Sequence, residues 1–401
     1  MFLQCINCKE RHEITDDIYF CSKCNDILEV INEYNKDNPI NRSDLFNKKT
    51  SIWKYIKLLP VLDENRIITL NEGGTTLHRS NRLSDKIGLN HLYIKNEGEN
   101  PTGSFKDRGV TLAITNALKF NKKKVICAST GNTSASVSAY AARAGLNSIV
   151  VIPSGKIAKG KLIQAKIYNS KIIQVLGNFD IALDLVYSVI KKNKDLCFLN
   201  SINPFRIEGQ KTLGFEIIDQ LQNIPDFIII PIGNGGNISA LWKGLKEYHD
   251  LSVINKLPII IGVQAEFASP IANSILNKLD TIKPINNPRT FATAIRIGAP
   301  VNWKRALNAI RESKGTVLTV TDKEIGEAQS NLAKYEGIFV EPAGATSIAV
   351  LNKLINKKII DKNDRIVCIT TGNGLKEPQI MRENINEVTI KPEYSLIEKE
   401  I

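Results

Sequence analysis

From residue 124 onward, short apolar runs typical of buried strands alternate with segments whose apolar residues recur at helical spacing. Apolar strands of this kind need cover on both faces of their sheet, and the intervening helices supply it. The first series predicts strands at 124–129, 148–152 and 171–176 and helices at 134–144, 160–168 and 181–192. The second predicts strands at 227–232, 258–264, 316–320 and 365–370, with helices at 209–222, from 238, and at 303–312, 322–335 and 345–355. We therefore expect an α/β fold of two blocks with a site in the cleft between them.

Composition narrows the class of partner. A chain of 401 residues is long enough for two domains. The net charge of +12 permits an anionic partner, but the one dense basic run, 122–124, is short and lacks interleaved aromatic residues. No apolar run approaches the roughly 20 residues that span a bilayer, and no signal-peptide pattern is present. We expect a cytoplasmic protein with no nucleic-acid partner and no membrane partner.

Lys106 is the first candidate for chemistry. It lies in the run 100–109, after small, turn-prone residues and before a predicted helix. Most lysines are solvated surface charges, but a lysine near the start of a helix is disfavoured as a cation by the helix dipole. A neutral amine in this position acts as a nucleophile and as a carrier of protons.

A glycine-rich turn, 233–237, follows the apolar strand at 227–232. Glycines allow consecutive backbone N–H groups to converge, and the start of the following helix adds donors, so the turn suits a phosphate. It matches neither the dinucleotide fingerprint nor the GxxxxGK[ST] loop, and alone it equally suits tight packing. Together with Lys106, however, it meets the two needs of pyridoxal phosphate, an amine for the aldehyde and an anchor for the phosphate.

Two more polar runs, 129–133 and 370–374, follow predicted strands at their carboxyl ends, where open α/β sheets bind ligands. Their hydroxyls, amides and backbone N–H groups suit a carboxylate or a ring heteroatom. One such run alone is best explained as a turn that caps the next helix. Several in one chain favour a shared ligand site.

With these motifs the chain resembles the threonine synthases, pyridoxal-phosphate enzymes of the tryptophan-synthase-β fold type, over nearly all its length. The run 100–109 matches their Schiff-base segment, 129–133 their asparagine loop and 233–237 their phosphate loop. The stretches 203–212, 294–298 and 371–376 separate these enzymes from dehydratases and cysteine synthases of the same fold.

The resemblance implies two doubly wound α/β domains with the cofactor in the cleft. Residues 33–110 and 205–401 would form the large cofactor domain, residues 111–204 the small domain, and residues 1–32 a ribbon-like extension. A homodimer is also implied. These boundaries are expectations for the structure.

The resemblance also implies a role for each motif. Lys106 would hold pyridoxal phosphate through a Schiff base, Asn132 would bond its ring hydroxyl, and Thr371 would meet its pyridine nitrogen. The cofactor phosphate would bind to the loop Gly233, Asn234, Gly235, Gly236 and Asn237. The substrate carboxylate would bind to Ser129, Thr130 and Thr133, and the substrate phosphate to Asn200, Ser201 and Arg206.

The implied reaction converts O-phospho-L-homoserine and water to L-threonine and phosphate, so the partner is a small phosphorylated amino acid. Lys106 would carry the successive protons. A second enzymatic reading is β-replacement on O-phosphoserine, as in cysteate synthase, because Arg206 would serve both substrates. Ala299 stands where the family commonly has asparagine, which leaves room for a changed substrate. A simple dehydratase has no use for a phosphate-binding arginine.

The amino-terminal cysteines form two CxxC pairs, Cys5 with Cys8 and Cys21 with Cys24, separated by twelve residues. Four thiolates at this spacing suit a closed, structural zinc site. They resemble the zinc-ribbon-like extension of archaeal-type threonine synthases, although Lys9 and Asn25 replace its usual knuckle glycines. Four metal-free thiols, a rubredoxin-like iron site, or a nucleic-acid-binding ribbon on an inactive fold are the alternatives.

Overall fold

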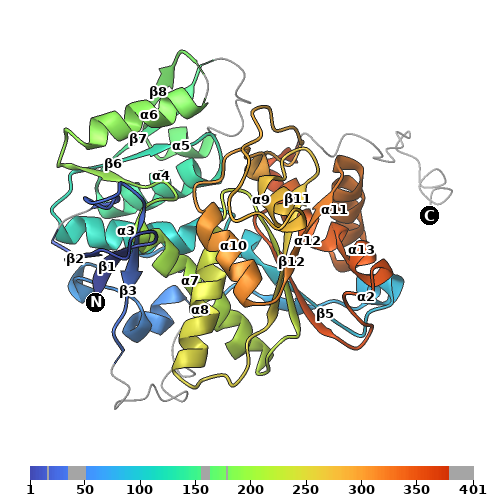
Figure 1. The fold of residues 1–401 in the computed structure, drawn as a ribbon. Coiled ribbons are helices and arrows are strands. Elements are labelled where there is room, and N and C mark those ends of the chain that lie inside the picture. Colours follow the sequence, from blue (N-terminus) through green and yellow to red (C-terminus); the bar gives the residue numbers. More distant parts are fainter. Residues whose placement is uncertain (16–17, 35–50, 155–162, 178, 379–401) are drawn as a thin grey trace, which may run out of the picture.

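The computed structural model describes residues 1–15, 18–34, 51–154, 163–177 and 179–378. They form a three-stranded, a six-stranded and a four-stranded sheet with surrounding helices (Figure 1). The strands are β1 (Phe2–Cys5), β2 (Arg11–His12), β3 (Leu28–Ile31), β4 (Leu77–Arg79), β5 (His91–Asn96), β6 (Lys124–Ala128), β7 (Asn147–Pro153), β8 (Lys171–Val175), β9 (Leu196–Phe198), β10 (Phe227–Pro231), β11 (Ile259–Ala265), β12 (Thr316–Val320) and β13 (Arg365–Thr370).

The α-helices match most of the predicted segments. They are α2 (Arg82–Ile87), α3 (Lys106–Lys119), α4 (Asn132–Ala144), α5 (Ile163–Ile167), α6 (Phe179–Ile190), α7 (Pro204–Leu221), α8 (Gly236–Asp250), α9 (Pro270–Leu276), α10 (Trp303–Glu312), α11 (Asp322–Glu336), α12 (Pro342–Ala349) and α13 (Leu351–Asn356). The 3-10 helices are η1 (Ile52–Leu58), η2 (Glu64–Arg66), η3 (Glu97–Glu99), η5 (Thr293–Ile295) and η6 (Gly374–Lys376). No helix among the described residues is long and apolar enough to cross a membrane.

The six-stranded sheet has the order β12-β11-β10-β13-β5-β4 and is parallel except for the pair β4–β5. Every residue of β10 is buried, as expected for a strand with helices on both faces. The sequence missed β5, because its polar residues interrupt the apolar pattern. Lys95 of β5 is nevertheless fully buried, since its ammonium group donates to Glu216 at 2.9 Å.

The four-stranded sheet is parallel, in the order β8-β7-β6-β9. Alternate residues of β6 belong to different cores: Val125 packs in a cluster with Val137 of α4, and Ile126 in a cluster with Val186 of α6. Helices therefore cover both faces of this sheet, as they cover those of the larger one, and the predicted α/β fold class is confirmed. The proposed division at residues 33–110, 111–204 and 205–401 remains a prediction.

Two predicted helices were placed wrongly. Helix α7 begins at Pro204, not at residue 209, because Asn203 caps it by accepting from the N–H of Phe205 and proline is favourable in the first turn. The predicted helix 345–355 is two helices, α12 and α13, that meet at Val350. Residues 160–162 of the predicted helix 160–168 lie outside the described residues.

Helices α3 and α7 approach each other very closely at two glycines. A Cβ on Gly109 would lie 2.6 Å from the carbonyl oxygen of Arg206, and one on Gly209 would lie 2.0 Å from that of Arg108. Only glycine permits this approach at both positions. The contact brings Lys106, at the start of α3, toward Arg206, in the first turn of α7.

The amino-terminal strands form an antiparallel sheet in the order β2-β1-β3. Its interior is continuous with the rest of the protein, since Leu3 and Leu28 lie in one apolar cluster with Val110 of α3 and Phe205 of α7. We call residues 1–32 the cysteine ribbon. It is packed against helices α3 and α7.

Candidate active site

Lys106 is the first residue of α3, as expected. Its segment is joined to the 371–373 segment by backbone hydrogen bonds, from Phe105 N to Thr371 O at 3.2 Å and from Asn373 N to Gly103 O at 2.9 Å. These two stretches are far apart in the sequence. The pairing places the candidate Schiff-base lysine beside the candidate partner of the pyridine nitrogen.

The surroundings of Lys106 favour a neutral amine. Burial and, to a smaller degree, the guanidinium of Arg206 lower the pKa of Lys106 to about 7, although the Glu341 carboxylate acts in the opposite direction. The ammonium nitrogen lies 4.1 Å from the centroid of the Phe105 ring. A substantial fraction of this lysine is therefore unprotonated near neutral pH, as a nucleophile and proton carrier requires.

Arg206 is a buried cation without a counter-ion among the residues the structure describes. Its residue surface is 1% exposed, its Nη1 donates to the carbonyl oxygen of Leu199 at 3.1 Å, and its Nε has no partner there. Burial lowers the pKa of Arg206 to about 10. Since a buried charge without compensation is costly, a site of this kind is suited to an oxyanion that enters from outside.

Glu341 is a functional candidate that the sequence analysis missed. Its carboxylate accepts hydrogen bonds from Asn132 Nδ2 at 2.8 and 3.1 Å and from Thr371 Oγ1 at 2.8 Å. The residue is 2% exposed, and burial raises the pKa of its carboxyl. Asn132 and Thr371, assigned independently to the cofactor ring, thus meet at one buried acid. The sequence feature that could have indicated Glu341 is a single glutamate between the apolar residue 340 and Pro342.

The loop 233–237 has the backbone expected of an anion cradle. Gly235 has φ of +79° at the start of α8, and a Cβ there would lie 3.0 Å from the carbonyl oxygen of Asn302. Neither amide atom of the buried Asn237 has a partner among the described residues. The hydroxyl of Ser104, fully buried two residues before Lys106, also lacks one there. These unpaired groups fit a bound phosphate-bearing cofactor.

Other predicted site residues are already hydrogen bonded. Asn234 donates to Ser201 Oγ at 2.9 Å and accepts from Val301 N at 2.6 Å. Both ends of the Asn200 amide bond the backbone of Ala128, each at 2.8 Å. Asn200 therefore braces the end of β6, which leaves its side chain less free for a substrate.

The proposed carboxylate site surrounds the start of α4. Ser129 Oγ accepts from Gly131 N at 3.2 Å, and Thr130 and Thr133 are half-buried in the same turn. The backbone N–H groups of the first helical turn lie here as well, where the helix dipole favours an anion. The assignment of these three residues to the substrate carboxylate stays a prediction.

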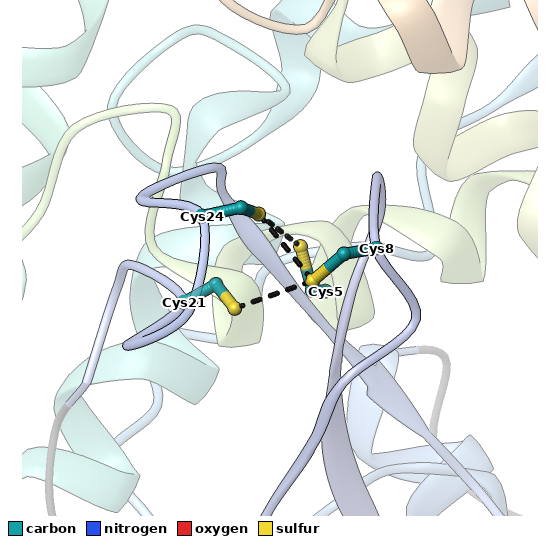
Figure 2. A group of neighbouring side chains, drawn as sticks. All are labelled: Cys5, Cys8, Cys21 and Cys24. Atoms are coloured by element: carbon teal, nitrogen blue, oxygen red, sulfur yellow. Dashed lines mark hydrogen bonds between the residues drawn. The ribbon is translucent and has the colours of Figure 1, made fainter.

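The four amino-terminal cysteines converge. Their sulfur atoms all lie within 4.8 Å of one another, with Cys5 and Cys24 at 3.4 Å and Cys8 and Cys21 at 3.6 Å (Figure 2). Lys9 and Asn25, in the positions of the missing glycines, have φ of 62° and 57°. The two turns therefore keep the left-handed backbone that glycine would favour. Neither lysine nor asparagine prevents the four thiols from meeting.

Comparison with known proteins identifies the class and the family of this chain. A family model described as pyridoxal-phosphate dependent enzyme matches residues 68–372, and the fold and site define a protein of this class. A threonine synthase of Methanocaldococcus jannaschii is 52% identical over 380 residues, 94% of this chain and 93% of that protein. Threonine synthases of Methanosarcina acetivorans (49% identical; 97% and 95% covered) and Mycobacterium tuberculosis (48%; 84% and 91%) are also similar. The chain belongs to the threonine synthase family.

Solved structures share the fold at lower identity. Maize serine racemase superposes with a TM-score of 0.67 at 24% identity, over 76% of this chain and 90% of that one. Threonine deaminase isoform 2 of Solanum lycopersicum superposes with a TM-score of 0.67 at 23% identity, over 88% and 98%. These similarities establish the architecture alone.

Proposed function

We propose that the chain converts O-phospho-L-homoserine and water to L-threonine and phosphate, with pyridoxal phosphate as cofactor. The observation that carries the proposal is the buried Arg206, which has no counter-ion in the described part of the chain and lowers the pKa of the Lys106 amine, in a member of the threonine synthase family. A phosphorylated substrate supplies the counter-charge that Arg206 lacks among the residues the structure describes. The chain is accordingly a carbon–oxygen lyase of threonine biosynthesis.

The residues of the candidate active site are suited to binding pyridoxal phosphate. Lys106 would hold its aldehyde, Asn132 and Thr371 would face its ring, and the loop 233–237 would hold its phosphate. When bound, the cofactor supplies an electron-accepting ring that stabilises negative charge next to the amino group of the substrate. The hydroxyl of Thr371 is uncharged, so it would stabilise a protonated ring nitrogen less than a carboxylate in its place.

Lys106 is the base that we assign to the proton transfers. Its pKa of about 7 allows it both to accept and to return a proton at neutral pH, which is the condition for efficient general acid–base catalysis. A single mobile amine reaches successive carbon atoms of one substrate. Arg206 holds the substrate phosphate and stabilises the negative charge that grows as phosphate departs. Ser129, Thr130 and Thr133 orient the carboxylate.

Glu341 acts in this proposal as a positioning residue. Its carboxylate holds the amide of Asn132 and the hydroxyl of Thr371 in fixed orientations. Ring contacts from two different segments are thereby set by one buried acid.

The decisive experiment measures phosphate release from O-phospho-L-homoserine and from O-phospho-L-serine, with products identified by mass. Threonine from the first substrate alone supports the proposal. Turnover of phosphoserine that requires an added nucleophile would overturn it in favour of β-replacement. The similar relatives are threonine synthases and do not favour that alternative. Ala299, which replaces the asparagine common in the family and suggested a changed substrate, is exposed.

We further propose that Cys5, Cys8, Cys21 and Cys24 hold one structural zinc ion. Support comes from the mutual approach of the four sulfur atoms and from the left-handed turns at Lys9 and Asn25. A closed set of four thiolates leaves no coordination position for a substrate. Elemental analysis of the purified protein tests this: one zinc per chain is expected, and iron or no metal contradicts it.

A homodimer and a cytoplasmic location complete the proposal. Light scattering of the holoenzyme is expected to give twice the mass of one chain, and a monomeric mass would refute the dimer. Fractionation of cells that express the full chain is expected to leave it in the soluble fraction.

A further inference from the structure

The cysteine ribbon meets the first turn of α10 through charged side chains. Lys304 and Arg305 lie in this turn, which contains no acidic residue, although the helix dipole disfavours cations there. The ribbon supplies the missing anions. Asp26 forms an ion pair with Lys304, and the Glu29 carboxylate lies 3.9 Å from Arg305 Nε. The carboxylates of the ribbon thus compensate the positive charges at the start of α10.

Arg305 makes the most specific of these contacts. Its side chain is 10% exposed, its Nη2 donates to the carbonyl oxygen of Leu28 at 2.7 Å, and its Nη1 donates to Asn302 Oδ1 at 3.0 Å. Leu28 is paired with Cys5 across the β1–β3 ladder. One guanidinium therefore joins a backbone position next to the sulfur cluster to the residue that precedes α10.

Asn302 in turn contacts both segments assigned to phosphate groups. It is fully buried, its N–H donates to the carbonyl oxygen of Asn234 at 3.1 Å, and its Nδ2 donates to that of Ser201 at 3.3 Å. Its own carbonyl oxygen is the atom that would lie 3.0 Å from a Cβ on Gly235. The orientation of Asn302 thus helps to set the position of the loop 233–237.

We propose that Arg305 is a positioning residue that couples the cysteine ribbon to the phosphate loop through Asn302. An ordered sulfur cluster holds Leu28, Leu28 holds Arg305, and Arg305 fixes the side chain of Asn302. Affinity of the loop for the cofactor phosphate then depends on the integrity of the ribbon. This inference rests on the proposed role of residues 233–237.

The first test compares Arg305→Met with Arg311→Met. Arg311 lies in the last turn of the same helix, and its guanidinium bonds Leu279 O and Asp280 at the surface, so it is a matched control. The readout is the dissociation constant of pyridoxal phosphate for the apoprotein, from the absorbance of bound cofactor. We expect Arg305→Met to raise this constant about tenfold, the usual scale of coupling between sites, and Arg311→Met to leave it unchanged. Equal constants in the two variants would overturn the proposal.

A double-mutant cycle with Cys24→Ser separates coupling from general damage. If ribbon and loop communicate through Arg305, Cys24→Ser weakens cofactor binding in the wild-type background and adds nothing in Arg305→Met. The pathway would be refuted if the two substitutions raised the dissociation constant of pyridoxal phosphate independently, so that their factors multiplied in the double variant. It would also be refuted if Cys24→Ser bound the cofactor with wild-type affinity. Arg305→Lys, which keeps one donor group, is expected to recover part of the affinity, and no recovery counts against the proposal.

These experiments distinguish a failure of the proposed coupling from a failure of the proposed function. Failure of that function appears as wild-type protein that binds no cofactor, or as a Lys106→Ala variant that keeps the cofactor absorbance band. Failure of the coupling leaves both of these normal and appears only in Arg305 and Cys24 variants.

Discussion

Thr371 donates a 2.8 Å hydrogen bond from Oγ1 to the buried carboxylate of Glu341. Asn132 donates to the same carboxylate from another part of the chain. A single acid thus fixes two groups that we assign to the cofactor ring. The same carboxylate raises the pKa of Lys106, against the larger lowering by burial. Glu341 therefore links the orientation of the ring contacts to the protonation of the amine.

Replacement of this acid is expected to change the titration of the lysine. In Glu341→Gln the negative charge that favours the ammonium form is gone, so the pKa of Lys106 should fall below its value of about 7. Rates of amine modification in the apoprotein, measured across pH, report that pKa. A variant with an unchanged or raised pKa would show that the carboxylate does not act on Lys106.

Loss of the lysine itself should abolish the chemistry. We expect Lys106→Ala to lose the visible absorbance of bound cofactor and at least about 10²–10⁴-fold in turnover, the range for a missing acid–base group. Lys119→Ala, at the exposed end of the same helix, is the control and should retain both. Normal absorbance in Lys106→Ala would place the Schiff base elsewhere.

Two buried arginines should respond oppositely to the same substitution. Arg206 lacks a counter-ion among the described residues, so Arg206→Met removes an uncompensated charge and should raise the free energy of unfolding by about 1–2 kcal/mol. Arg108 pairs with Glu97 at 2.6 Å and with Glu216 at 2.7 Å. Arg108→Met leaves the buried Glu97 without its ion-pair partner and Glu216 with Lys95 alone, and should cost about 3–5 kcal/mol. Urea unfolding measures both.

The Arg206 variant also tests substrate recognition. Arg206→Met should raise the KM for O-phospho-L-homoserine strongly while the dissociation constant of pyridoxal phosphate stays near that of the wild type. Equal weakening of both ligands would mean that the guanidinium serves the cofactor. Steady-state kinetics and cofactor titration on one preparation distinguish the two results.

The depressed pKa of Glu216 predicts how the free energy of unfolding changes at acidic pH. Burial raises the pKa of its carboxyl, but Arg108 and Lys95 outweigh burial and hold the pKa well below its ordinary value. Because the folded pKa is depressed, the stabilisation is complete above the unfolded value of about 4.3 and is lost as pH falls below it. Glu216→Gln should be less stable than the wild type at pH 7, and its stability should decline less between pH 5 and pH 3. If the free energy of unfolding declined equally with pH in the wild type and in Glu216→Gln, this prediction would be wrong.

Much of the fold could be predicted from local patterns. Apolar runs such as that of β10 and helix starts such as Lys106 depend on neighbouring residues, so periodicity and turn-forming residues reveal them. The same holds for the loop 233–237, whose glycines satisfy a local backbone requirement. Strand β5 escaped prediction because Lys95 is buried by virtue of a distant partner, Glu216. No local pattern encodes that pairing.

Contiguous motifs encode the α/β class, the family resemblance and the residue types that suit pyridoxal phosphate, so these could be inferred from local stretches of the chain. Which of these residues meet depends on how distant segments pack. The approach of α3 and α7 at Gly109 and Gly209 brings Arg206 toward Lys106. The hydrogen bonds from Asn132 to Glu341 and from Arg305 to Leu28 each join segments more than 200 residues apart. Long-range packing and the burial of charge determine such contacts, and neither is a property of a local stretch of sequence.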